Sequence, residues 1–448
     1  MKNITLLIAL IVGIPWAALS QGCLPDGIEF FSQSEIDNFQ ANHPNCTEIE
    51  GGVYVSGSDI TNLNGLNMIT SIGVDLAIEY NYSLTDITGL SSLTSVGASI
   101  LLVDNISLPS LSGLDGITIV NQDLSIYNHR SLISLAGLNS ITSVGSYLDL
   151  YGNSLLTDLT GLNGLTTVNL QLYIAESDSL VSLNGLEGLT SVGNDLVIWN
   201  NESLQSLTEL EQLSSIKSLS LFNNPVLVNL SGLESLVEIR GRLRVVENNE
   251  LTDFTGINNV TSIGGSLEIR DNPQLANLMA LASVVSINGM IGVENNDALS
   301  TLAGLDHINP ATIDSIEIFG NQSLSTCEVQ SVCEYLATPG TIVNIHDNAS
   351  GCNSEQQVDS ACQVVNITEL QFSNLYSLFP IPAHDKLHIL THNDEVVEQV
   401  SIYNQFGQKV KSGKAANNVI DIMGLKSGLY IIEIQHGKTN FRKKFIVG

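Results

Sequence analysis

The chain has 448 residues and carries 46 acidic side chains against 16 basic ones, so its formal net charge is −30 at pH 7. This charge argues against binding to nucleic acid, because phosphates require a basic surface. After residue 20 no segment is long and apolar enough to cross a membrane, so no transmembrane segment is expected.

Residues 1–20 have the pattern of a secretory signal peptide. Lys2 supplies a positive charge, a mostly apolar run extends from Ile4 to Ala17, and small residues follow. We therefore expect an exported chain that begins at Gln21.

Six cysteines in an exported chain suggest disulfide bonds. They lie only in the segments 21–59 and 324–365, on either side of a repeat region, which predicts two disulfide-bonded caps. At the front the simple choice is one bond, and the rear four cysteines leave three pairings open. Alternatives are a rear zinc site, which lacks Cys-x-x-Cys spacing, and a lipidated first cysteine, which would leave an odd number. The cysteines are Cys23 and Cys46 at the front and Cys327, Cys333, Cys352 and Cys362 at the rear.

Each cap also contains the spacing of a helix start. Ser32 with Glu35 has the spacing of a capping box, and Ser325 with Glu328 repeats it. Apolar residues at helical spacing follow both pairs, so a short helix is expected in each cap.

Residues 60–323 are close copies of one segment of about 24 residues. Apolar side chains in each copy are spaced by three, then four, then two residues, and the spacing by two indicates one face of a strand. Such a period predicts a solenoid, in which each turn buries its apolar face against its neighbours. We expect a mainly β, leucine-rich-repeat-like right-handed β-solenoid of about 12 turns with one long parallel sheet. The copies start at Ile60, Leu84, Leu108, Leu132, Leu156, Leu180, Leu204, Leu227, Leu251, Leu275 and Leu299, and a last one starts at Leu324.

An asparagine ends most of the predicted strands. Asparagine tolerates turns and bonds local backbone groups, so a stacked column of them would satisfy amides that the bend leaves unpaired. The same oxygens could hold a structural calcium ion, although the x-D-x-D pattern of calcium repeats is absent; no other cofactor is expected. A glycine marks another corner of many copies, as at Gly89, Gly113, Gly137, Gly161 and Gly185, and predicts an unusual backbone angle or a close approach. The asparagines are Asn81, Asn105, Asn153, Asn201, Asn224, Asn248, Asn272, Asn296 and Asn321.

The composition changes near residue 365. Residues 366–448 hold nine basic and seven acidic side chains, which leaves seven basic and 39 acidic ones, a net charge near −32, for the rest of the chain. Short alternating segments in this part predict a small immunoglobulin-like β-sandwich. These segments are KLHIL from Lys386, QVSIYN from Gln399, NVIDI from Asn418, GLYIIEI from Gly428 and KKFIV from Lys443.

The repeat region resembles the receptor L domain, a leucine-rich-repeat-like β-helix of growth-factor receptor ectodomains. The resemblance covers roughly Cys46 to Asn348 and rests on CTEIEGGVYVSG from Cys46 together with ENNEL at Glu247 and RDNPQL at Arg270. It implies extracellular recognition of a protein or a glycan, and it transfers no binding residues.

The last segment is similar to the type A carboxy-terminal sorting domain of the type IX secretion system. Four motifs occur in the order of that family: FPIPAHDKLHI from Phe379, VSIYNQFGQKV from Val400, LKSGLYIIEI from Leu425 and KKFIV at the end. The resemblance implies contact with the secretion machinery, passage through the periplasm of a Gram-negative bacterium, and secretion or display on the outer cell surface.

No catalytic motif is present: the chain lacks HExxH, GxSxG and a P-loop, and its eight histidines are scattered. The carboxylates recur mostly at turns and strand edges, which is typical of a solvated surface. A β-helix carbohydrate-active enzyme is therefore the least favoured alternative, and no catalytic residue is predicted.

The third outward position of successive strands is rich in aromatic residues. Tyr127, Tyr151, Trp199 and Phe222 occupy four of five consecutive places, and Tyr173 lies nearby, although aromatics make up only 5% of the chain. With strands about 4.8 Å apart, these five turns would present an aromatic strip on the order of 20 Å long. Exposed apolar patches often mark contact sites, and aromatic faces suit sugars or protein side chains. The alternative is packing between neighbouring strands.

Most of the positive charge of the repeats lies beside this strip. Arg242, Arg244 and Arg270 should face outward together and could form a subsite for an anion or carboxylate. They could equally pair with Glu247 and Glu268. The sequence favours a recognition or adhesion protein that binds an extracellular protein or glycan, with a structural spacer protein as the alternative.

Overall fold

The structure is a computed structural model of the whole chain. It describes residues 22–363 and most of 376–447, with breaks at 381–382, 392–396, 398, 405–407, 416–417, 427 and 437–438. The signal peptide predicted over 1–20 lies outside the described residues.

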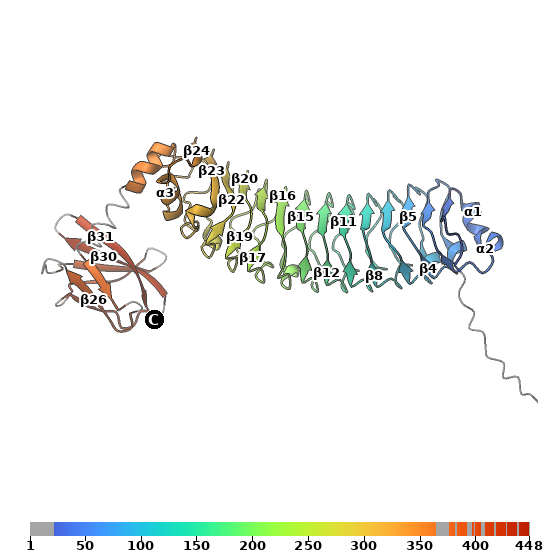
Figure 1. Cartoon of the computed structure of the whole chain (residues 1–448), viewed down its shortest axis with the longest axis horizontal. Helices are drawn as coiled ribbons and strands as arrows, with labels where there is room; N and C mark the ends of the chain where they lie inside the picture. Colours follow the sequence, from blue (N-terminus) through green and yellow to red (C-terminus); the bar gives the residue numbers. More distant parts are fainter. Residues whose placement is uncertain are drawn as a thin grey trace, which may run out of the picture.

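Residues 22–363 form a parallel β-solenoid (Figure 1). Its main sheet contains fourteen strands in chain order, so thirteen steps separate the first from the last, close to the expected count of about 12 turns. The segment 21–59, predicted as a cap, contributes two of these strands. The strands are β1 Ile28–Phe30, β3 Val53–Val55, β5 Leu76–Glu79, β7 Ile100–Val103, β9 Leu124–Tyr127, β11 Tyr147–Tyr151, β13 Gln171–Ala175, β15 Asp195–Trp199, β16 Ser218–Phe222, β18 Leu243–Val246, β20 Leu267–Arg270, β22 Gly289–Glu294, β23 Ile313–Phe319 and β24 Ile342–His346.

A second side of the solenoid carries shorter two-residue strands, which pair in three small parallel sheets. Single turns of 3-10 helix lie between some of these strands and the main sheet. The short strands are β2 Glu48–Ile49, β4 Ser71–Ile72 and β6 Ser95–Val96; β8 Ile119–Val120, β10 Ser143–Val144, β12 Thr167–Val168 and β14 Ser191–Val192; and β17 Glu238–Ile239, β19 Ser262–Ile263 and β21 Ser286–Ile287. The 3-10 turns are η1 Asn64–Leu66, η2 Thr88–Leu90, η3 Thr208–Leu210, η4 Met279–Leu281 and η5 Pro310–Thr312.

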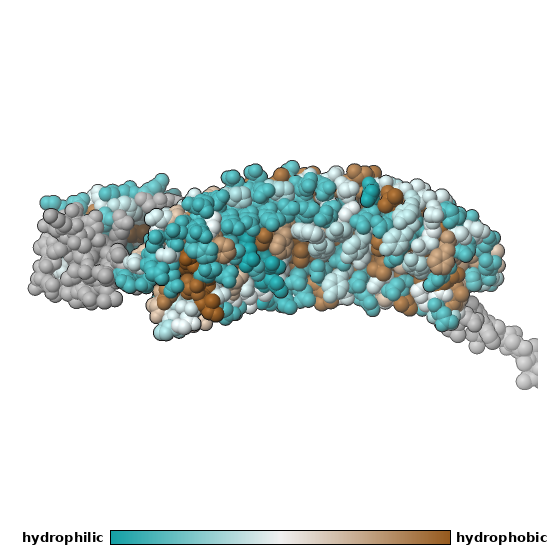
Figure 2. All heavy atoms as spheres, turned by 90° about the horizontal axis from the view of Figure 1, so that it is seen from above, coloured by the Kyte–Doolittle hydropathy of each residue, from teal (hydrophilic) through white to brown (hydrophobic). Residues whose placement is uncertain are grey.

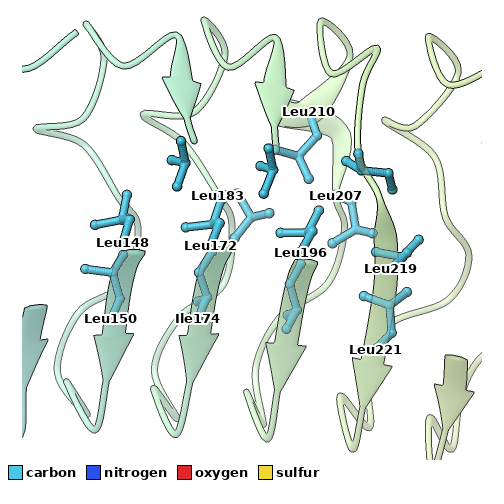
Figure 3. Close-up of a cluster of buried hydrophobic side chains, with 14 of the residues drawn as sticks. Leu148, Leu150, Leu172, Ile174, Leu183, Leu196, Leu207, Leu210, Leu219 and Leu221 are labelled. Atoms are coloured by element: carbon cyan, nitrogen blue, oxygen red, sulfur yellow. The ribbon is translucent and has the colours of Figure 1, made fainter. Parts of the chain in front are cut away.

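Inward side chains of every turn stack into one continuous apolar core. In Figure 3 Leu172 and Ile174 of β13 point toward Leu183 on the other side of the coil, and Leu196 and Leu219 repeat the arrangement in the next turns. All of these side chains are fully buried. Since each turn covers only its neighbours, the core depends on every turn being present.

A ladder of buried asparagines runs along the bend that follows the main strands, as predicted. In a typical rung, Asn248 Nδ2 donates to the carbonyl oxygen of Leu221 in the preceding turn at 3.1 Å. Asn248 Oδ1 accepts from the main-chain N–H of Asn224 at 3.1 Å, while the N–H of Asn248 donates to Asn272 Oδ1 at 3.0 Å. The ladder therefore satisfies main-chain groups that the bend removes from the sheet.

The ladder extends further than the sequence indicated and is interrupted twice. Asn348 adds a rung at the rear, where its Oδ1 accepts from the N–H of Asn321 at 3.0 Å. His129 and Ser177 occupy two rungs, and both are buried. His129 donates its main-chain N–H to Asn153 Oδ1 at 3.2 Å, but its Nδ1 has no hydrogen-bond partner among the described residues.

The corner glycines have the properties expected of them. Gly185 has a φ of 109°, and Gly113, Gly137 and Gly161 also have positive φ values. Gly89 does not, but a Cβ there would overlap the carbonyl group of Leu63. Close approach between successive turns, with or without an unusual φ, thus requires glycine at this corner.

The front cap confirms the sequence prediction. Helix α1 (Gln33–Asp37) starts at Ser32, whose side chain forms a capping box with Glu35, and α2 (Phe39–Asn42) follows it. A disulfide bond joins Cys23 to Cys46.

The rear cap differs from the prediction at its helix start. Helix α3 (Gln330–Leu336) begins after Val329, without a side-chain cap, so the capping box predicted at Ser325 is wrong. Ser325 still belongs to the solenoid, because its N–H donates to the carbonyl oxygen of Ser300 in the turn before. Residues 355–363 form a further helical segment. The disulfides Cys327–Cys352 and Cys333–Cys362 resolve the pairing left open by the sequence and replace the zinc alternative.

The C-terminal part contains two small antiparallel sheets whose buried side chains share one core, in agreement with a small sandwich. All five predicted segments are strands, and β25 and β28 are additional. The first sheet holds β25 Tyr376–Phe379, β26 Lys386–Thr391 and β29 Val419–Asp421, and the second holds β28 Lys409–Gly413, β27 Gln399–Asn404, β30 Gly428–His436 and β31 Thr439–Val447. Among the described residues no helix has the length and apolarity needed to cross a bilayer.

Replacing His129 by asparagine should remove the loss of folding stability that His129 causes at low pH. Burial lowers the pKa of His129 to about 4, so between pH 6.5 and 4 the unfolded chain takes up a proton that the folded chain does not. Wild-type stability should therefore fall with decreasing pH, by about 2 kcal/mol between pH 7.5 and pH 5, from about 1.4 kcal/mol per pKa unit. Urea unfolding at both pH values should show that this loss is absent from His129→Asn.

The control is Ser177→Asn, which changes another rung without adding or removing a titratable group. Its effect on stability should be the same at pH 7.5 and pH 5. Equal pH dependence of wild type and His129→Asn would show that His129 is not responsible.

Alanine at Gly185 should destabilise the solenoid more than alanine at Gly188 in the same turn. A Cβ at Gly185 would overlap the carbonyl oxygen of Leu159 and would force alanine to adopt a φ of 109°. At Gly188 the nearest atom would lie 3.2 Å away. We expect a loss of roughly 3 kcal/mol for Gly185→Ala, near the upper end for a strained backbone, and a much smaller loss for Gly188→Ala. Similar urea midpoints for the two variants would contradict this explanation.

Candidate functional site

The outward face of the main sheet carries the column that the sequence predicts. Strand pairing places Tyr127 beside Tyr151, Ala175 beside Trp199, and Trp199 beside Phe222. The complete column, in chain order, is Glu79, Val103, Tyr127, Tyr151, Ala175, Trp199, Phe222, Val246, Arg270, Glu294, Phe319 and His346.

Four of the aromatic rings form one uninterrupted row. The ring centroids of Tyr127 and Tyr151 lie 5.8 Å apart, those of Tyr151 and Tyr173 lie 6.4 Å apart, and those of Tyr173 and Trp199 lie 6.5 Å apart. Tyr173 belongs to the neighbouring column, opposite Asp149, yet its ring bridges the gap that Ala175 leaves between Tyr151 and Trp199. Ala175 is consequently buried.

Phe222 continues the row on the next strand and is covered by an arginine. The guanidinium carbon of Arg244 lies 4.9 Å from the centroid of the Phe222 ring, within the range of a cation–π contact. We define the aromatic strip as Tyr127, Tyr151, Tyr173, Trp199 and Phe222. Trp199 is 37% exposed, and the other four rings are partly buried by their neighbours.

A carboxylate anchors one end of the aromatic strip. Tyr127 donates its hydroxyl hydrogen to Asp149 Oδ2 at 3.0 Å, and burial raises the pKa of both groups. Burial, with a smaller contribution from Tyr151, raises the pKa of Tyr173 to about 12. Tyr127 and Tyr173 are therefore neutral at physiological pH. The strip can offer apolar ring edges and phenol hydroxyls to a partner.

Two of the three predicted arginines pair with carboxylates on the same face. Arg244 Nε lies 3.1 Å from Glu268 Oε2, and Arg270 lies 3.8 Å from that oxygen and 3.0 Å from Glu294 Oε1. Burial raises the pKa of Glu294, and the charge of Arg270 opposes this rise. The sequence anticipated the pairing with Glu268 but not the pairing of Arg270 with Glu294.

Arg242 lies apart from this network, just before β18, and is exposed. Within the described part of the chain it makes no ion pair. Figure 2 shows that one whole face of the molecule is largely hydrophilic, with small separate apolar patches.

Among residues 22–363 and the described C-terminal segments, no group of three or more His, Cys, Asp and Glu side chains could hold a metal ion. The ladder asparagines considered as calcium ligands direct their oxygens at main-chain and side-chain N–H groups of the solenoid.

Sequence reasoning missed two charged residues of this face, Asp149 and Lys217, and it placed Glu294 in the outward column without its contact with Arg270. Asp149 lies in an outward column and Lys217 lies directly before β16, so alignment of the copies could have revealed Asp149. The contact of Asp149 with Tyr127 and that of Glu294 with Arg270 could be recognised only from the positions of the side chains.

Comparison with known families identifies the C-terminal part. Residues 377–448 match the family described as secretion system C-terminal sorting domain. The chain is therefore exported by the type IX secretion system to the outside or the outer surface of a Gram-negative bacterium. Comparison with curated proteins gives no match.

Removal of the Tyr173 ring should expose Trp199. The chain has two tryptophans, and Trp16 lies in the predicted signal peptide, so Trp199 alone should report from a chain that starts at Gln21. Tyr173→Ala should shift its fluorescence to longer wavelength and increase quenching by acrylamide about twofold or more, while Tyr173→Phe should behave as wild type. Tyr147→Ala, which removes an exposed tyrosine of the same face, is the control. An unchanged spectrum in Tyr173→Ala would contradict the bridging role of this ring.

Proposed function

We propose that the protein is a recognition or adhesion protein, and not an enzyme, that binds an extracellular glycan or protein through the aromatic strip. The observation that carries this proposal is the gathering of five aromatic residues on five successive turns of one outward face. Trp and Tyr are the residues most enriched at binding hot spots.

Three further features support the proposal. Export places the strand face outside the cell, where it can meet a ligand. The resemblance of the repeats to receptor L domains is in keeping with extracellular recognition. The solenoid presents a long rigid surface, because its turns are fixed by the ladder and by two caps closed with disulfides.

A second function, that of a structural spacer, is favoured by the ring stacking itself. Tyr151, Tyr173 and Trp199 direct their faces at one another, with interplanar angles of 7° and 28°, which stabilises neighbouring strands without any ligand. A spacer would retain these contacts and bind nothing.

The test is binding of the full chain to a glycan array and to extracellular matrix proteins, with the double variant Trp199→Ala, Tyr151→Ala. We expect the double variant to lose at least tenfold in affinity, which corresponds to about 1.4 kcal/mol, with an unchanged circular dichroism spectrum. The matched control is Tyr80→Ala, Tyr82→Ala, which removes two exposed tyrosines from the turn after β5. Absence of any ligand, or equal affinity of all three proteins, would favour the spacer.

A further inference from the structure

An open hollow of about 350 Å³ lies on the strand face, at the amino ends of β15, β16, β18 and β20. Its lining is mostly polar and contains both charges and hydroxyl groups. The lining residues are Asp195, Lys217, Ser218, Gly241, Arg242, Gly265, Ser266 and Glu268.

Small residues create this hollow. Gly241 lies directly over Ser218, and a Cβ there would meet Ser218 Oγ at 2.5 Å. Gly265 lies over Gly241 in the next turn, where a Cβ would meet the main chain of Gly241 and Arg242 at 3.0–3.2 Å. At these two glycines the successive turns approach each other with no side chain between them. The longer side chains of Lys217 and Arg242 line the space that is left.

Near the aromatic strip, the positive side chains without an ion pair to a described carboxylate lie in the hollow. Lys217 Nζ contacts only the neutral Asn194 Oδ1, at 3.3 Å, among its described partners, and Arg242 forms no ion pair with a described residue. Glu268 is already paired with Arg244 and Arg270. With Glu268 set aside, the hollow holds two positive side chains, Lys217 and Arg242, against the one negative side chain of Asp195. The local charge is thus positive in a part of the chain whose net charge is near −32.

We propose that this hollow binds a sugar acid, that is, a glycan unit that carries a carboxylate together with hydroxyl groups. Arg242 and Lys217 would hold the carboxylate, since a guanidinium can donate two parallel hydrogen bonds to it. Asp195 and Glu268 would accept hydrogen bonds from the sugar hydroxyls, and Ser266 Oγ, which accepts the N–H of Met290 at 3.2 Å, keeps its own hydrogen for donation. This mixture of donors and acceptors suits a hydroxylated acid better than an acidic peptide.

The acidity of the solenoid favours a ligand with separated charges. A dense polyanion would be repelled by the surrounding carboxylates over a Debye length of about 8 Å at physiological salt. A glycan with one carboxylate at the hollow and neutral units elsewhere avoids most of this repulsion.

The hollow and the aromatic strip share two strands, β15 and β16. From Asp195 to Trp199 the strand β15 rises about 13 Å, at about 3.3 Å per residue. Glu268 connects the two regions, because it lines the hollow and pairs with Arg244, which covers Phe222. This inference therefore rests on the proposed function and assigns a ligand class to it: the strip contacts the body of the glycan and the hollow holds its acid group.

The test compares an aldotetraouronic acid, which carries one glucuronic acid on three neutral xylose units, with its methyl ester, in which a methyl group replaces the negative charge, by titration calorimetry on the full chain. We expect the acid to bind wild type at least tenfold more tightly than the ester. Arg242→Gln should abolish this difference, Arg242→Lys should retain part of it, and affinity for the ester should not change in either. Arg240→Gln is the matched control, because Arg240 is an exposed arginine of the same turn outside the hollow, 3.8 Å from Glu238.

The outcomes separate this inference from the proposed function. If acid and ester bind wild type equally, and Trp199→Ala, Tyr151→Ala weakens both, the strip is a binding site and the hollow is not. If Arg240→Gln and Arg242→Gln weaken the acid equally, the effect is one of overall charge and the inference fails. It also fails if neither sugar binds, or if hexaglutamate binds in an Arg242-dependent manner while the sugar acid does not.

Discussion

The buried bend after each main strand is the constraint on which the rest of this molecule depends. There the chain turns through a residue with positive φ, such as Asn200 or Asp271, and removes main-chain groups from the sheet. A buried group without a partner is destabilising by about 1–3 kcal/mol, so every turn needs a side chain that both donates and accepts. Asparagine does so by bonding main-chain groups of the preceding turn, which requires successive turns to stay in register and keeps the repeat near 24 residues.

Constant register has a consequence for the outer face. Because the ladder and the stacked core align every strand with the next, outward positions separated by one repeat become neighbours along the whole sheet. Aromatic residues scattered through the sequence are thereby gathered into one strip, and small residues before successive strands are gathered into one hollow. The need of each bend for a hydrogen-bond donor and an acceptor thus determines which outward positions become neighbours. It leaves the outward side chains themselves free to vary.

The repeat period predicted the solenoid and the outward column, because burial and alternation are local properties of each copy. It did not reveal β1 and β3, since the segment 21–59 pairs with the sheet without resembling a copy. Ser325 and Glu328 were misread as a helix start because their spacing fits a capping box, whereas pairing of residues 325–326 with Ser300 continues the solenoid for another half turn. The bridging ring of Tyr173 and the contact of Arg270 with Glu294 depend on side-chain directions that spacing alone cannot give.

The ring geometry also bears on what the strand face can recognise. In the aromatic strip the faces of Tyr151, Tyr173 and Trp199 are largely directed at one another, and Arg244 covers Phe222. Ring edges and phenol hydroxyls remain for a partner, and these give apolar contact without strong selectivity. Selectivity must then come from polar groups held beside the strip, where a wrong partner would leave charges unpaired. On this face, Arg242 and Lys217 in the hollow are the cations that described carboxylates leave uncompensated, which makes the hollow the place where discrimination between ligands can arise.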